Sequence, residues 1–197
     1  MSVKITDGFN PGDDEKVISI LDKWKGGPLS DQLFTKIAPI IPQASLITVV
    51  FRKDGENLQT LLLKRSEDDP IWPETLNLPG KMFRKIDFER EDNIPENGPI
   101  ERIEQNELDL RFTKKPEFAG IAFQDTKRGP TIVLVYVTDE KIETPKNGEW
   151  HNVEDTKGLA NMIETEFVAI DVAQKHYLAS LNHLPSLYPV EFQKKSA

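Results

Sequence analysis

The chain has 197 residues, a length sufficient for one α/β domain with an appendage, and its 38% hydrophobic and 29% charged residues are ordinary for a soluble globular protein. It contains no cysteine, which excludes disulfide bonds, thiol catalysis and thiolate metal sites. The formal net charge of −8 argues against a protein that binds the nucleic acid backbone, because such a protein presents a basic patch.

Two features bear on the location of the protein. No apolar run approaches the roughly 20 residues that span a bilayer, so we expect no membrane partner. The N-terminal segment Met-Ser-Val-Lys-Ile-Thr-Asp-Gly lacks the long apolar core of a signal peptide. We therefore expect a cytoplasmic protein.

Two short helices are predicted at the N-terminus. Apolar residues of the first helix recur at helical spacing and form one face: Val17, Ile18, Leu21 and Trp24. Ser30 can cap a second helix, which ends before Pro39. We expect residues 1–40 to form a helical extension whose apolar face packs on the main domain. A dimer contact and a lid are the alternatives.

The main domain is expected over residues 41–190, with 191–197 as a flexible tail. Strands are predicted at residues 44–52, 59–65, 118–124 and 131–138, with a short one at 150–153. Helices are predicted at residues 100–110 and 162–181, and a long loop at 66–99 with an extended piece near 76–78. This order predicts the α/β (α+β) class, a mixed β-sheet flanked by helices on both faces.

Three sequence features follow one another at the start of this domain. They are a strand that ends in basic residues (Leu61-Leu62-Leu63-Lys64-Arg65-Ser66), then Trp72, then a Leu-Pro-Gly turn (Leu76-Asn77-Leu78-Pro79-Gly80-Lys81). The combination resembles the lead-in to the signature of the Nudix hydrolase superfamily. With the order of elements, the resemblance extends from Ala44 to Tyr177. It implies a Nudix-type mixed sheet between helices and Mg²⁺-dependent cleavage of a phosphoanhydride in a nucleoside diphosphate linked to another group.

The family signature is written G-x5-E-x7-R-E-U-x-E-E-x-G-U, where U is a bulky aliphatic residue. Its carboxylates lie one helical turn apart, so they can hold Mg²⁺ or Mn²⁺ ions that bridge a diphosphate and activate a water molecule. In this chain the signature is degenerate. Arg102 lies 22 positions after Gly80 (102 minus 80), eight more than the 14 of the family pattern. The glutamate positions then fall on Ile86, with Asp87 beside it, and on Ile103, Asn106 and Glu107.

The resemblance nevertheless implies a set of site residues. The expected catalytic residues are Glu107, Glu104 and Arg102, the arginine orienting a glutamate. The expected metal ligands are Glu107, Glu104 and Glu101, spaced i, i+3, i+6 on one helix. The expected substrate-binding residues are Arg65, Gly80, Lys81 and Arg84. The alternative is that the glutamate stripe is a solvated helix face and the basic side chains are surface charges.

Two functions therefore remain open. The first is a divergent Mg²⁺- or Mn²⁺-dependent hydrolase, in which acidic residues of the inserted loop, beginning with Asp87, can supply missing ligands. The second is a non-catalytic binding module that keeps the cavity for a nucleotide-like ligand or for a protein partner. Trp72 or Phe83 can stack on a base in either case, or Trp72 can pack the loop against the core. The expected partner is a small nucleotide or diphosphate compound, and a homodimer is possible.

Overall fold

The computed structural model describes residues 15–16, 18–20, 22–23, 30–38, 40–182 and 190–192. The predicted helix capped by Ser30 is present as α2 (Asp31–Ile37), and the Ser30 Oγ accepts a hydrogen bond from the Leu33 amide at 3.4 Å. The buried Ala38 follows, and its carbonyl accepts a bond from Gln43 Nε2 at 3.1 Å, which ties the extension to the first strand. Of the apolar face predicted for the first helix, only Ile18 is described, and it is 56% exposed. Its other members, Val17, Leu21 and Trp24, lie outside the described residues.

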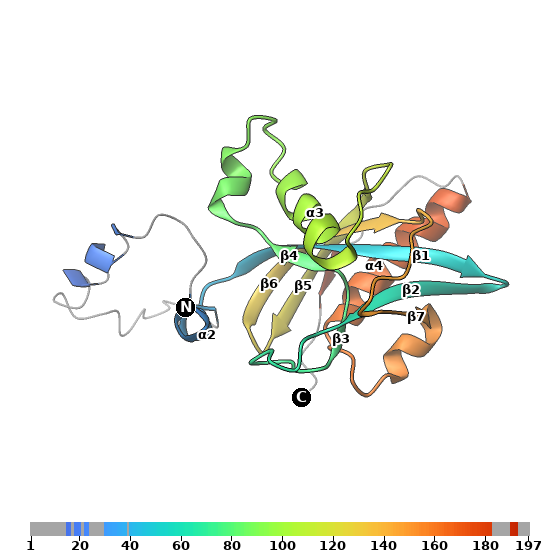
Figure 1. Ribbon diagram of the computed structural model, residues 1–197, viewed down its shortest axis with the longest axis horizontal. Helices are drawn as coiled ribbons and strands as arrows, with labels where there is room; N and C mark the ends of the chain where they lie inside the picture. The colour runs from blue at the N-terminus through green and yellow to red at the C-terminus, as the bar shows by residue number, and fades with distance from the viewer. Residues whose placement is uncertain are drawn as a thin grey trace, which may run out of the picture.

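The strands of the described chain form one mixed sheet (Figure 1). They are β1 (Gln43–Asp54), β2 (Asn57–Lys64), β3 (Leu76–Asn77), β4 (Gly80–Met82), β5 (Glu117–Thr126), β6 (Gly129–Thr138), β7 (Gly148–Asn152) and β8 (Val190–Phe192). Their order is β3-β2-β1-β6-β5-β8, with β4 paired to β1 and β7 to β2. The β1–β6 and β5–β8 pairs are parallel, and the other strand pairs are antiparallel.

Strand β1 organises this sheet because it changes neighbours along its length. Its first part pairs with β4 on one side and with β6 on the other, whereas its last four residues pair with β2. Side chains alternate across a strand, so Ile47 and Val49 enter one core cluster and Leu46 and Val50 enter the other. Burial on both faces explains why this segment is an almost continuous apolar run.

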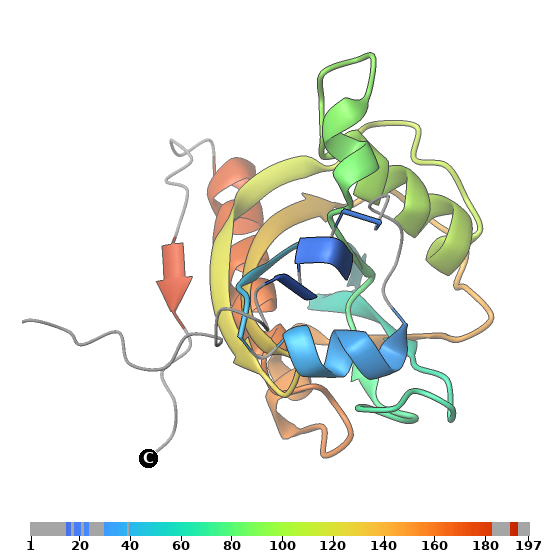
Figure 2. The same cartoon turned by 90° about the vertical axis from the view of Figure 1, so that its left-hand side faces the viewer.

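One helical layer covers each face of the sheet. On one face, α3 (Asn97–Ile103) contributes Ile100 and Ile103 to the cluster around Leu46. On the other face, α4 (Glu166–Leu181) contributes Ile170 and Val172 to the cluster around Val49. Figure 2 shows α3 and α4 on opposite sides of the strands. The predicted class, a mixed sheet between helices, is therefore confirmed.

Several boundaries differ from prediction. The helix expected over residues 100–110 begins at Asn97 and continues from Glu104 to Leu108 as a π-helix, η2. The long loop contains strand β4 and a 3₁₀-helix, η1 (Lys85–Glu89), and a second 3₁₀-helix, η3 (Val153–Gly158), follows β7. Helix α4 begins four residues later than expected because the Ile163 amide donates to the Leu76 carbonyl at 3.0 Å, extending this segment beside β3. Every helix among the described residues is too short or too polar to span a bilayer.

Candidate functional site

The predicted Leu-Pro-Gly turn lies at the centre of the site. Gly80 opens β4, which approaches β1 so closely that a Cβ atom at this position would lie 3.0 Å from Ile47 Cγ1 and 3.3 Å from the Leu46 carbonyl oxygen. A larger residue here would have to displace Ile47 or the β1 backbone by a few tenths of an ångström, so glycine suits this close approach. The Gly80 amide is free to bond outwards, towards the helical layer.

The partner of that amide is Glu107, on η2. Its Oε2 accepts from the Gly80 amide at 2.8 Å, and its Oε1 pairs with Lys81 Nζ at 2.6 Å. Burial raises the pKa of Glu107, although Lys81 and the Gly80 amide oppose the shift. The one glutamate that keeps a signature position thus has both oxygens engaged within the chain.

A pocket opens beside this pair, between β1, β4, the β5–β6 hairpin and the start of α4. Of the predicted substrate-binding residues, Arg65, Gly80 and Lys81 line it. Arg84 does not belong to its described lining and is exposed at the start of the 84–98 segment. The pocket combines cationic side chains on its rim with amide and hydroxyl side chains on its walls, such as Asn77.

Glu166, the first residue of α4, is a pocket residue that the sequence analysis missed. It is only 9% exposed, and its Oε2 is a buried oxygen with no hydrogen-bond partner in the described chain. Burial raises the pKa of Glu166 to about 8, with Arg65 opposing and Glu107 reinforcing the shift. The side chain is therefore largely protonated near neutral pH and can donate a hydrogen bond into the pocket. An acid at the start of an apolar helix was the only sequence signal.

Asp69 is the second missed residue, and it pairs with two arginines at the rim of the pocket, Arg65 and Arg128. It accepts from Arg65 Nε at 3.0 Å, also contacts Arg65 Nη2, and pairs with Arg128 Nη2 at 3.3 Å. Its Oδ1 accepts from the Ile71 and Trp72 amides at 3.0 and 2.8 Å. Burial alone would raise the pKa of Asp69, but these hydrogen bonds hold it at about 2. Its sequence signal was the i, i+4 spacing from Arg65.

Trp72 lies between the two arginines that Asp69 gathers. Its ring centroid is 4.9 Å from Arg128 Cζ and 5.9 Å from Arg65 Cζ, within the range of cation–π attraction. Phe34 of α2 lies 5.9 Å from Arg128 Cζ, so the N-terminal extension reaches this rim. Phe83, the other predicted stacking residue, instead lies against Phe88 with the ring centroids 5.7 Å apart.

Arg102 points away from the pocket, towards the segment after β4. It pairs with Asp87 through Nη1 at 2.5 Å and Nη2 at 2.9 Å, and Nη2 also donates to the Met82 carbonyl at 2.9 Å. The carboxylate that Arg102 holds is therefore Asp87, while Ile86, at the position counted for the first glutamate, is 65% exposed.

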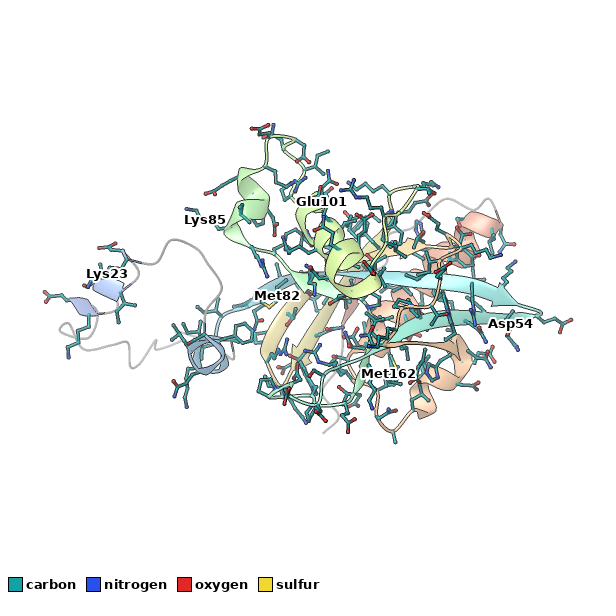
Figure 3. All side chains as sticks on the ribbon, in the orientation of Figure 1. Lys23, Asp54, Met82, Lys85, Glu101 and Met162 are labelled. Atoms are coloured by element: carbon teal, nitrogen blue, oxygen red, sulfur yellow. The ribbon has the colours of Figure 1, made fainter. Side chains whose placement is uncertain are left out.

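The other two predicted metal ligands point in different directions from Glu107. Glu104 is buried and its Oε1 accepts from the Phe112 amide at 2.7 Å. Glu101 pairs with Arg90 on the exposed side of α3 (Figure 3). The stripe assumed an α-helical period, but the π-helix changes the direction of each later side chain.

These placements decide whether a divalent ion fits the described site. Mg²⁺ requires near-octahedral oxygen ligands, usually one or two carboxylates together with phosphates or water. Within the described ranges, no three histidine or acidic side chains lie together as a metal group. Glu107 and Glu166 supply two carboxyl groups, and both oxygens of Glu107 already accept bonds from Lys81 and the Gly80 amide. The described residues therefore do not form an assembled set of ligands for a resident metal ion.

Comparisons with known proteins identify the fold. No protein-family model matches the sequence, and no curated protein does. Two solved structures superpose with a TM-score of 0.53: a mutT/nudix family protein from Listeria innocua, 15% identical, and the NUDIX domain of Shewanella oneidensis NrtR complexed with ADP ribose, 14% identical. The matches cover 74% and 76% of this chain, and 98% and 99% of those chains.

Two further solved structures superpose on the same part of the chain. A MutT protein from Methanosarcina mazei Go1 is 16% identical, with a TM-score of 0.50 over 69% of this chain and 95% of that one. NrtR complexed with a 27mer DNA is 14% identical, with a TM-score of 0.51 over 70% of this chain, and the match spans only 62% of NrtR. The chain has the Nudix fold, as the resemblance predicted.

Proposed function

We propose that this chain with the Nudix fold is a binding module for an anionic, nucleotide-like ligand, which it takes in the pocket beside Gly80. The observation that carries the proposal is the engagement of Glu107 by Lys81 and by the Gly80 amide. Two other signature glutamate positions are Ile103 and Asn106, which lack a carboxylate. The proposal therefore assigns ligand binding to the pocket without a metal centre.

The chemistry of the pocket supports this ligand class. Arg65 and Lys81 can meet phosphate oxygens, because guanidinium and ammonium groups form charge-assisted hydrogen bonds with them. Glu166, Asn77 and Gln124 offer neutral polar atoms to the edge of a base or sugar. The related NrtR domain carries ADP ribose, a nucleoside diphosphate linked to a second sugar. We use the same chemical class as the probe.

The test is calorimetric titration of the chain with ADP ribose and with ADP, in the presence of EDTA. We expect binding without metal, and we expect Arg65→Met to weaken it by about 10- to 100-fold, the worth of one hydrogen bond to a charged group. The control is Arg111→Met, because Arg111 is exposed and lines a different hollow. Absence of binding to both probes, or equal losses in the two variants, would overturn the proposal.

Retained hydrolysis is the second candidate, and one observation favours it. The charge of Glu107 raises the pKa of Glu166, which means that the two carboxyl groups lie near each other. Such a pair could hold a divalent ion together with the phosphate oxygens of a ligand. Nucleotide or phosphate release with Mg²⁺ or Mn²⁺ tests this candidate. This candidate is the one that requires the predicted catalytic and metal-binding roles of Glu107, Glu104, Glu101 and Arg102. If it holds, Glu107→Gln should lose activity by orders of magnitude.

A further inference from the structure

The segment between β4 and α3 contains the eight residues that the signature match could not place. It rises from the body of the molecule (Figures 1 and 2). Several polar contacts fasten it: Arg102 holds Asp87, Arg90 pairs with both Asp92 and Glu101, and Asn97 Nδ2 donates to Asp92 at 3.0 Å. The segment is therefore a built feature of the fold.

This fastened segment nevertheless presents large apolar side chains to solvent. Ile86 and Phe88, both on η1, are 65% and 66% exposed. They flank Asp87, which is 2% exposed and anchored, so the turn that carries them is held in place. One side of the Phe88 ring lies against Phe83, and both Ile86 and Phe88 keep most of their surface exposed. An ordered apolar projection is typical of a surface that docks on another protein surface.

Further apolar residues lie at the same end of the sheet. The β1–β4 ladder pairs Ser45 with Met82 and is extended by the Phe83 amide, which donates to the Ala44 carbonyl at 3.0 Å. The segments before β1 and after β4 separate beyond this point, one towards α2 and the other towards η1 (Figure 1). Ile40 and Ile41, just before β1, are 73% and 53% exposed but are not placed beside η1. We define the η1 patch as Ile86 and Phe88 together with the charged residues Lys85 and Glu89 that begin and end η1.

The charges around the patch indicate which partner fits it. Lys85 begins η1 and Glu89 ends it, with side chains 68% and 57% exposed. Lys85 points away from the body (Figure 3). When two copies of η1 pack antiparallel about a twofold axis, Lys85 of each copy lies beside Glu89 of the other, and the apolar side chains meet between them. The patch is thus complementary to itself in charge and in polarity.

We propose that the η1 patch is the interface through which two copies of this chain form a symmetric dimer. Lys85 and Glu89 also pair with each other within one chain at 3.2 Å, but an exposed intrachain pair contributes little. In the dimer the two intrachain pairs, one in each chain, are exchanged for two pairs between chains, which adds specificity to the apolar contact. This inference does not depend on the ligand of the pocket.

The test uses the full chain in analytical ultracentrifugation. We expect the native chain to be dimeric at micromolar concentration, and Phe88→Asp to weaken the dimer by at least about 30-fold, the effect of losing a central interface side chain. The matched control is Leu181→Asp, because Leu181 is 45% exposed on α4, on the opposite face of the sheet. A cooperative thermal unfolding transition of Phe88→Asp would show that the variant is folded, although loss of the dimer should lower its midpoint.

Charge reversal then tests the symmetry. Lys85→Glu and Glu89→Lys should each weaken the dimer, because like charges then face each other across the axis. An equimolar mixture of the two variants should form a heterodimer of native affinity, since both cross pairs become opposite in charge again. A monomeric native chain, a mixture that stays monomeric, or equal losses in Phe88→Asp and Leu181→Asp would overturn the proposal.

Discussion

Substituting Gly98 in helix α3 by alanine should destabilise the protein, although alanine normally stabilises a helix relative to glycine. A Cβ atom at Gly98 would overlap the Asp87 carboxylate, lying 2.7 Å from its Cγ. Asp87 cannot withdraw without losing its bonds to Arg102 at 2.5 and 2.9 Å and to the Arg84 amide at 2.6 Å. The substitution therefore breaks a buried ion pair in order to admit one methyl group.

The magnitude follows from two opposing contributions. Breaking a buried ion pair costs about 3–5 kcal/mol, because a charge remains buried without its partner. Alanine returns at most about 1 kcal/mol through helix propensity. We therefore expect Gly98→Ala to lower the free energy of unfolding by about 2 kcal/mol or more. In an Asp87→Ala background, where the space is vacant, the same substitution should be neutral or stabilising.

Urea unfolding followed by tryptophan fluorescence measures both values, with the midpoint and the slope fitted together. Gly158→Ala is the control, because a Cβ atom at Gly158 meets nothing within 4 Å. If Gly98→Ala stabilises the native chain, or costs as much in the Asp87→Ala background, then Asp87 does not hold the position that we describe.

Three further predictions concern single side chains. Glu104→Gln should lower the free energy of unfolding by about 1–2 kcal/mol, by weakening the bond from the Phe112 amide, and should leave ligand affinity unchanged in calorimetry. Because the pKa of Glu166 is about 8 when folded and 4.5 ordinarily, the folded chain keeps a proton that the unfolded chain releases between these values. Stability should therefore fall as the pH rises from about 4.5 to 8, and thermal scans of Glu166→Gln should show a flatter dependence. The Arg52 guanidinium lies 4.1 Å from the Trp150 ring centroid, so Arg52→Met should cost about 0.5–1 kcal/mol through this contact. The loss should be smaller in a Trp150→Leu background, where only the bond from Arg52 Nε to Gln59 Oε1 remains to be lost.

The strands were predictable from the sequence because their signals are local. The Asp54-Gly55 turn, with Gly55 at φ 61°, joins two apolar runs, and β1 and β2 lie within two residues of the expected boundaries. Strand β4 was missed because a three-residue strand carries no periodic signal. Only the packing of Gly80 against β1 makes it a strand.

The pocket was less predictable, because its geometry depends on tertiary contacts. Sequence spacing placed Glu101, Glu104 and Glu107 on one face, which holds for an α-helix but not for the π-helix that begins at Glu104. Asp69 and Glu166 carry no motif, and each gains its importance from side chains that are distant in the sequence. Arg65, Gly80 and Lys81, which belong to or flank the Leu-Pro-Gly motif, do line the pocket, whereas Arg84, chosen for the same reason, does not.

Asp69 links the rim of the pocket to the backbone of its own loop. The carboxylate that holds Arg65 and Arg128 also accepts the Ile71 and Trp72 amides, so a ligand that draws the arginines away leaves these amides as the main partners of Asp69. Amide hydrogen exchange at Ile71 and Trp72 thereby becomes sensitive to occupancy of the pocket, even though neither amide need touch the ligand. The exchange rates of these two amides would therefore report binding of a candidate ligand to the pocket.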